Sequence, residues 1–151
     1  MMHRTGMLLA GLVFLFGCAS QPGTTTTTPP QPPAGLAIPE GMAELYLFND
    51  SGKTLVPSSQ EITDNGKTIA SLARQTYVRL FITTGPHVLR PDPYLWKQEV
   101  RLNAAAGITY YVAIAYKPER SWAWPLTGAP LVMKLLTKEQ ALPMRNEMRP
   151  Q

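Results

Sequence analysis

The chain has one cysteine, Cys18, and two histidines, His3 and His87, among its 151 residues. A single cysteine cannot form a disulfide within the chain, and one cysteine with two histidines does not make up a zinc site. The same scarcity leaves no nucleophile and base pair for a catalytic triad. The glycines that follow the first thirty residues stand singly, as turn glycines do, and form no phosphate-binding loop. We therefore predict no catalytic residue, no metal site and no cofactor, and expect the protein not to be an enzyme.

Charge is also sparse. Asp, Glu, Lys and Arg make up 16% of the residues, and 14 basic against 10 acidic side chains give a net charge of +4. The basic residues are scattered among acidic ones, whereas a nucleic-acid-binding domain gathers them on one face. The sequence predicts no nucleic-acid partner, and at most a weak attraction to anionic envelope surfaces.

No apolar run in the sequence reaches the length of a transmembrane helix. The longest, residues 7–16, spans about 15 Å as a helix, which is half of a hydrocarbon core of about 30 Å. It follows His3-Arg4 and ends just before Cys18, which is the layout of a secretory signal peptide. The sequence therefore predicts a signal peptide over residues 1–17.

The four residues Leu15-Phe16-Gly17-Cys18 resemble the lipobox that closes the signal peptide of bacterial lipoproteins. The resemblance implies transfer of a diacylglyceryl group to the Cys18 thiol, cleavage after Gly17 and N-acylation of the new terminus. Several acyl chains anchor a protein stably, whereas one does so only marginally. Ala19 stands in place of the aspartate of the inner-membrane retention signal, which implies an outer-membrane protein whose domain faces the periplasm. The alternative is an ordinary signal peptide, or an uncleaved anchor, with a coincidental cysteine.

Residues 18–40 contain few side chains that a core could bury. They include five consecutive threonines at residues 24–28 and two proline pairs. A segment of this composition does not pack, and its prolines favour extended geometry. We predict a lipidated cysteine followed by a disordered linker that reaches up to about 60 Å. Glycosylated threonines or a peptide-recognition motif are the alternatives to an inert spacer.

Residues 41–151 alternate apolar and polar side chains in short runs separated by turn residues. A period of two is typical of strands with one buried face. Residues 96–102 alternate in this way, residues 108–116 are apolar on both faces as in an interior strand, and residues 131–136 are expected to be the last strand. We predict a mainly β fold, a small antiparallel β-sandwich or open barrel with a short C-terminal helix, preceded by the disordered linker.

The helix is predicted from its first turn. Thr137 and Gln140 have the spacing of a capping box, so the helix is expected to begin at Lys138. Pro143 lacks an amide hydrogen, and we expect it to disturb the helix.

Two turns predict β-hairpins. Asn65-Gly66 suits a type I′ turn, because both residues tolerate the positive φ that this turn requires. That turn pairs Ile62 with Ile69. Residues 83–86 are expected to form the loop of a second hairpin, which brings His87 onto the apolar face. We therefore expect a buried structural histidine there, with a functional base as the alternative.

A set of short motifs runs through the segment after the linker: Leu45-Tyr46-Leu47-Phe48, Asp64-Asn65-Gly66-Lys67, Ile69-Ala70-Ser71-Leu72, Tyr77, Gly85-Pro86-His87, Gly107 and Tyr110-Tyr111-Val112. By these residues the chain resembles a family of small bacterial lipoproteins that carry a β domain of unknown activity. The resemblance implies the fold and the location, and it supplies no catalytic residue.

The stretch from Ser121 to Pro130 is too rich in proline to be a central strand, yet it contains Trp122 and Trp124. One interpretation is that the two tryptophans pack across the open end of the sandwich, because tryptophan buries a large area. The alternative is an exposed aromatic platform for a glycan or a partner protein, to which Tyr94 and Trp96 would add.

Together these features predict a lipid-anchored periplasmic binding or scaffold module of the cell envelope. Its expected partners are the membrane, through the acyl chains on Cys18, and an envelope protein or glycan. The alternatives are an envelope glycan-binding protein, or a hydrolase with an unrecognised carboxylate pair.

Overall fold

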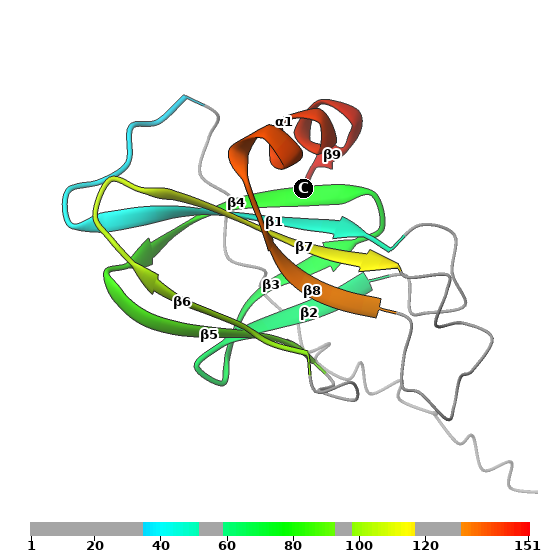
Figure 1. The fold of residues 1–151 in the computed structure, drawn as a ribbon, viewed down its shortest axis with the longest axis horizontal. Helices are drawn as coiled ribbons and strands as arrows, with labels where there is room; N and C mark the ends of the chain where they lie inside the picture. The colour runs from blue at the N-terminus through cyan, green and yellow to red at the C-terminus, as the bar shows by residue number, and fades with distance from the viewer. Residues whose placement is uncertain (1–34, 52–58, 93–97, 117–130) are drawn as a thin grey trace, which may run out of the picture.

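The structure is a computed structural model that describes residues 35–51, 59–92, 98–116 and 131–151. Within these ranges nine strands form two sheets that lie one over the other, and one helix packs on the outside (Figure 1). The predicted mainly β fold with a short C-terminal helix is confirmed. The two sheets have separate edge strands, so the fold is a sandwich and not a closed barrel.

The larger sheet consists of β1 Met42–Asp50, β4 Thr76–Thr83, β7 Thr109–Tyr116, β8 Leu131–Leu136 and β9 Arg149–Pro150. Its strands lie in the order β8-β7-β1-β4-β9. The central strand β1 pairs antiparallel with β4 and parallel with β7, and β9 pairs parallel with β4. The two parallel pairs join segments far apart in the sequence, so the alternation along each strand could not reveal them.

The smaller sheet consists of β2 Ser59–Asp64, β3 Lys67–Ala73, β5 Gly85–Asp92 and β6 Val100–Ala104. Its strands lie in the order β3-β2-β5-β6, and all of its pairs are antiparallel. In β6 Val100 and Leu102 are buried while Arg101 is exposed. The alternation predicted for this strand is therefore confirmed in its described part.

The main core lies between the two sheets, and β1 shows how alternation builds it. Leu45 and Leu47 point toward the smaller sheet, whereas Tyr46 and Phe48 point to the outer face and form a second core with the helix. Residues of both sheets meet the inward side chains of β1 and are fully buried there: Ile62, Leu72, Leu89 and Val112.

The helix α1, Lys138–Glu147, covers the outer face of the larger sheet (Figure 1). Its capping box forms as predicted, because the Thr137 hydroxyl accepts a hydrogen bond from the Gln140 amide and the Gln140 side-chain carbonyl accepts one from the Thr137 amide. The expected disturbance at Pro143 is wrong, since the helix continues through it. Proline removes one hydrogen bond near the first turn, while Ala141 is fully buried against the sheet and holds the helix in place.

Residues 131–136 are not the last strand. After α1 the chain returns as β9 to the free side of β4, where the Arg149 amide donates to the carbonyl of Gln75 (3.3 Å) and the Gln151 amide donates to that of Tyr77 (3.0 Å). A strand of two residues is too short to show a period in the sequence.

The turn between β2 and β3 has the predicted geometry, with a φ of 49° at Asn65 and of 86° at Gly66. The predicted pairing of Ile62 with Ile69 is wrong, because a bulge shifts the register and Ile62 pairs with Ala70. The bulge leaves one residue of β3 without a partner on β2. The apolar side chains on both sides of the bulge therefore stay on the face that points to the core. Ile62 and Ala70 thus both lie in the main core, and Ile69 packs at its margin.

The second predicted hairpin is wrong. Strands β4 and β5 lie in different sheets, so the chain crosses from the larger to the smaller sheet at residues 83–86. Gly85 has a φ of 117° there, which glycine adopts without steric cost. His87 is nevertheless buried, with 6% of its surface exposed, as predicted.

Candidate functional site

Five residues predicted to attach lipid or to bind a partner lie outside the described part of the chain: Cys18, Tyr94, Trp96, Trp122 and Trp124. Their roles therefore stay predictions. The structure does describe the residues at which the aromatic segments 93–97 and 117–130 join the fold. Pro91 and Gln98 lie close to the ends of the first segment, and Leu131 directly follows the second.

These three residues line one pocket, together with Ile114, Val132 and Met133. The pocket forms where β5 and β7 end and where β8 begins. Its empty space is about 190 Å³, including the part open to solvent. Residues that flank the two aromatic segments in the sequence thus line the same pocket.

Of the described residues that line the pocket, all but Gln98 are apolar. The hollow is small and shallow, so it offers an apolar surface against which a partner's side chain can rest, with the Gln98 amide as a hydrogen-bonding group. None of the described residues that line the pocket carries a titratable side chain.

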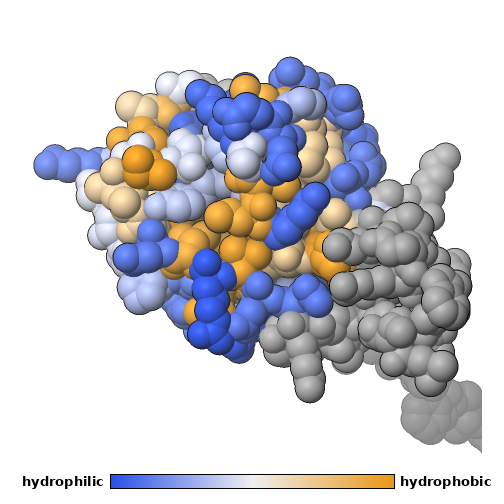
Figure 2. Space-filling view, in the orientation of Figure 1, coloured by the Kyte–Doolittle hydropathy of each residue, from blue (hydrophilic) through white to orange (hydrophobic). Residues whose placement is uncertain are grey.

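The pocket opens on the side of the sandwich where β6 and β8 are the edge strands. Figure 2 shows this side of the molecule, and an apolar surface bordered by polar residues runs across it. Leu135 of β8 is 52% exposed, the highest value among the large apolar side chains of the described ranges. Contiguous apolar surface of this kind marks interaction sites on soluble domains.

His87 lies in the interior and connects the two sheets. Its Nδ1 is 2.6 Å from Oδ2 of Asp64, at the end of β2, and its Nε2 is 2.8 Å from the carbonyl oxygen of Thr83, at the end of β4. Both ring nitrogens are thus engaged within the protein, as expected of a structural histidine. The second oxygen of Asp64 is buried and has no hydrogen-bond partner.

A second buried polar cluster lies on the outer face of the larger sheet, and sequence reasoning missed it. Arg79 of β4 forms an ion pair with Glu44 of β1 and donates to the carbonyl of Leu36, and Thr109 donates to Oε2 of Glu44 (2.7 Å). Glu44 and Arg79 are 8% and 7% exposed. The available signal was that each charge interrupts an apolar run of its strand; in the register of β1 and β4 the two residues are diagonal neighbours, because Glu44 lies opposite Phe81 and Arg79 opposite Tyr46.

The aromatic side chains Tyr46 and Tyr111 stack beside this cluster, with ring centroids 5.5 Å apart. Burial raises the pKa of the Tyr111 hydroxyl, and the negative charge of Glu44 raises it further. Arg145 of α1 lies over the Tyr46 ring, 6.0 Å from its centroid. This face of the sheet is thus closed by the helix and acts as a packed layer.

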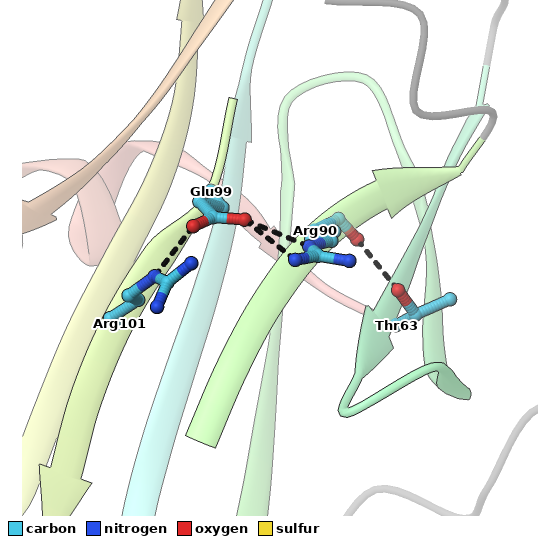
Figure 3. Close-up of polar contacts among 4 residues, drawn as sticks. All are labelled: Thr63, Arg90, Glu99 and Arg101. Atoms are coloured by element: carbon cyan, nitrogen blue, oxygen red, sulfur yellow. Dashed lines mark hydrogen bonds and ion pairs between the residues drawn. The ribbon is translucent and has the colours of Figure 1, made fainter. Parts of the chain in front are cut away.

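The smaller sheet carries a surface ion cluster on its outer face (Figure 3). Arg90 and Arg101 both bind the carboxylate of Glu99, at 2.9 Å and 2.6 Å, and Thr63 donates to the Arg90 carbonyl. The hydrogen bond from Arg101 is the main cause that lowers the pKa of Glu99, and Arg90 adds to it. Exposed pairs of this kind contribute little to stability, in agreement with their interpretation as solvated surface charge.

In the ranges that the structure covers, no three His, Cys, Asp or Glu side chains gather in a way that could hold a metal ion. No helix of the described residues is long and apolar enough to cross a membrane. Comparison of the chain with protein-family models, with curated proteins and with solved structures found no match. The fold and the pocket thus define a two-sheet β-sandwich with an apolar pocket at one open edge. Its likeness to small envelope lipoproteins rests on the sequence motifs alone.

Proposed function

We propose that this protein is a lipid-anchored binding or scaffold module of the bacterial cell envelope. In this proposal acyl chains on Cys18 hold it at the outer membrane, and the β-sandwich faces the periplasm. The observation that carries the proposal is Leu15-Phe16-Gly17-Cys18 at the end of the apolar run, with no other cysteine in the chain.

The proposed tether joins the fold near Leu36, whose carbonyl accepts a hydrogen bond from Arg79. From Cys18 to Gly35 the chain spans about 50 Å when fully extended at about 3.1 Å per residue. A tether of this reach lets the sandwich contact partners well clear of the membrane surface.

The binding role is supported by the pocket at the edge between β6 and β8. It is apolar apart from Gln98, it is open to solvent, and residues that flank the two aromatic segments in the sequence line it. By contrast, the carboxylates of Glu44, Asp64 and Glu99 each already bind a cationic or histidine side chain. No observation favours the hydrolase alternative.

The anchor is tested in bacterial cells that express the full chain. We expect the wild-type protein in the membrane fraction, with mass spectrometry showing acyl groups on Cys18, and we expect Cys18→Ser to be unprocessed or soluble. The matched control is the double variant Cys18→Ser/Ser20→Cys, which keeps one cysteine but moves it out of the motif. Unmodified Cys18 in the wild-type membrane fraction, or acylation of the displaced cysteine, contradicts the proposal.

A glycan is the second candidate partner, and the four aromatic residues in the segments flanked by pocket-lining residues favour it. Aromatic platforms bind through a few large side chains, so their truncation removes binding while stability is kept. If Trp122 and Trp124 instead pack in the core, each change to alanine costs about 3 to 5 kcal/mol. We expect at least one of the two to be structural.

Thermal unfolding of each single variant, measured beside its retention on isolated envelope material, separates the two roles. A destabilised variant assigns that tryptophan to packing. A stable variant that loses retention assigns it to the platform. A stable double variant with full retention contradicts both.

A further inference from the structure

The strand β8 forms one edge of the larger sheet. All six of its residues pair with β7, from Leu131 opposite Tyr116 to Leu136 opposite Tyr111, and the register is continuous. Among the described residues no strand pairs with its other side. The outer backbone groups of a regular edge strand are a template for a further strand.

This edge lacks the features by which proteins protect exposed strands. The sequence of β8, LVMKLL, contains no proline and no glycine, its pairing shows no bulge, and Lys134 is its one charge. The edge strand β9 in contrast consists of Arg149 and Pro150, and the edge strand β6 exposes Arg101 and Asn103. The edge strand β3 has a bulge in its pairing with β2, and the Gln151 side chain binds its Ala73 amide and Ser71 carbonyl. Charges, prolines and short length block edge pairing, so β8 is the edge that these features leave open.

One apolar side chain on β8 is left uncovered. Leu131 and Met133 lie in the main core. Leu135 pairs with Val112, which also lies in that core, so Leu135 points to the same inner face. Yet 52% of its surface is exposed, because the sheet ends there.

We propose that β8 pairs antiparallel with β8 of a second copy of this chain, about a two-fold axis at Met133. In this register Leu131 lies opposite Leu135 of the second copy, and the Met133 residues face each other. All inner-face contacts are then apolar, and each Leu135 is covered. A closed two-fold contact of this kind uses one self-complementary surface.

The neighbouring registers are excluded by the same residues. An axis at Lys134 places two ammonium groups directly opposite each other, which is unfavourable. An axis between two residues places inner side chains against outer ones, because side chains alternate along a strand. An axis at any other residue of β8 places inner side chains opposite residues beyond the end of the second strand; an axis at Val132, for example, leaves Leu135 without a partner in β8. The axis at Met133 is thus the register that pairs every inner side chain of β8, and the two five-stranded sheets become one continuous sheet.

Cysteine cross-linking tests the register in bacterial cells that express the full chain. In Met133→Cys the two residues on the axis have Cα atoms about 4.5 to 5.5 Å apart, within the range that disulfides span. We expect mild oxidation to give a covalent dimer whose linked peptide contains residue 133 from both copies. The control Leu135→Cys is more exposed, but in this register its copies lie about 13 Å apart along the strands. Leu135→Cys is therefore expected to give no dimer. The double variant Leu131→Cys/Leu135→Cys is expected to give one, because residue 131 of one copy lies opposite residue 135 of the other. Wild type, with only Cys18, serves as the blank.

A second measurement does not depend on the cysteines. Leu135→Lys places a charge on the inner edge, where it blocks pairing but loses little buried surface in the single domain. For the full chain in detergent, we expect light scattering to show at least a tenfold weaker dimer, with an unchanged melting temperature of the dissociated protein.

Three results overturn the proposal. The first is a folded Met133→Cys chain that forms no dimer, or that forms an adduct with another protein instead. The second is equal cross-linking of Met133→Cys and Leu135→Cys. The third is a Leu135→Lys chain that dimerises like wild type. If Met133→Cys does not fold, the light-scattering measurement decides alone. Mapping of the linked peptides separates a disulfide at residue 133 from one at an unacylated Cys18, so a failure of the anchor and a failure of the pairing are distinguishable.

Discussion

His87 and Asp64 form a buried pair within the smaller sheet, and the same imidazole also reaches the larger sheet. The imidazole takes its second hydrogen-bond partner from the last residue of β4, Thr83, so one ring connects β2, β4 and β5. The crossing at Gly85 brings β5 into the other sheet and places the ring between the layers. A polar bridge at this place fixes how the two sheets are aligned.

Removing the histidine alone leaves a buried carboxylate without its partner. We expect His87→Leu to lower the free energy of unfolding by about 3 kcal/mol, in the range found when one member of a buried pair is lost. The double variant His87→Leu/Asp64→Leu removes both polar groups, and we expect it to be more stable than the single variant. Urea denaturation of the three proteins measures this, and a double variant less stable than His87→Leu contradicts the argument.

The Glu44–Arg79 pair predicts a large difference between two arginines. Arg79→Met leaves Glu44 buried and the Leu36 carbonyl without a donor, so we expect a loss of about 3 to 5 kcal/mol. The control Arg90→Met removes an exposed partner of Glu99 and is expected to have little effect on stability. Chemical denaturation of both variants measures the contrast, and equal losses show that burial of the pair does not matter.

The turn at Asn65-Gly66 tests backbone conformation separately from packing. A Cβ at Gly66 would meet no atom within 4 Å, so a substitution there acts through the positive φ alone. We expect Gly66→Val to cost about 1 to 3 kcal/mol through backbone strain. Asn65→Gly serves as control and is expected to be nearly neutral, because glycine tolerates the same φ. An unchanged melting temperature for Gly66→Val contradicts a type I′ turn.

Tyr111 makes stability fall at high pH. Its pKa is raised in the folded protein, whereas an unfolded tyrosine ionises near pH 10. Above about pH 10 the unfolded chain therefore releases a proton that the folded chain keeps, so the free energy of unfolding decreases until the pH passes the folded pKa. Urea midpoints measured against pH test this. We expect Tyr111→Phe to lose less stability over this range than wild type, and parallel curves for the two proteins rule out the effect.

The sequence predicts the parts of the fold that depend on neighbouring residues. Period-two alternation predicts β6, a run that is apolar on both faces predicts β7, the spacing of Thr137 and Gln140 predicts the start of α1, and Asn65-Gly66 predicts the turn. Each of these depends on backbone preference or on one buried face. They are therefore readable without knowing the rest of the chain.

The parts that failed depend on which distant segments meet. The parallel pairing of β1 with β7 and the crossing between sheets at residues 83–86 depend on the total packing of the two layers. The pocket at the edge unites three separate chain segments, and alternation along one strand carries no signal for it. Glu44 and Arg79 were visible as charges in apolar strands, but only the pairing of β1 with β4 brings them together.

The hydrogen bond from Arg79 to the Leu36 carbonyl also determines at which end of the sandwich the N-terminal segment enters the fold. It holds the entering chain where β1 and β7 begin, while the pocket lies where β7 ends, about 17 Å farther along the strand for the five residues from Thr109 to Ile114. If acyl chains on Cys18 anchor the domain as proposed, a linker that enters at this end leaves the pocket at the end of the sandwich that faces away from the bilayer. In the antiparallel pair proposed above, the two linkers leave from opposite ends. Under the proposed anchoring, both acylated termini must reach the same membrane, which requires linkers that span tens of ångströms; a shortened linker would then prevent either the pairing or the anchoring.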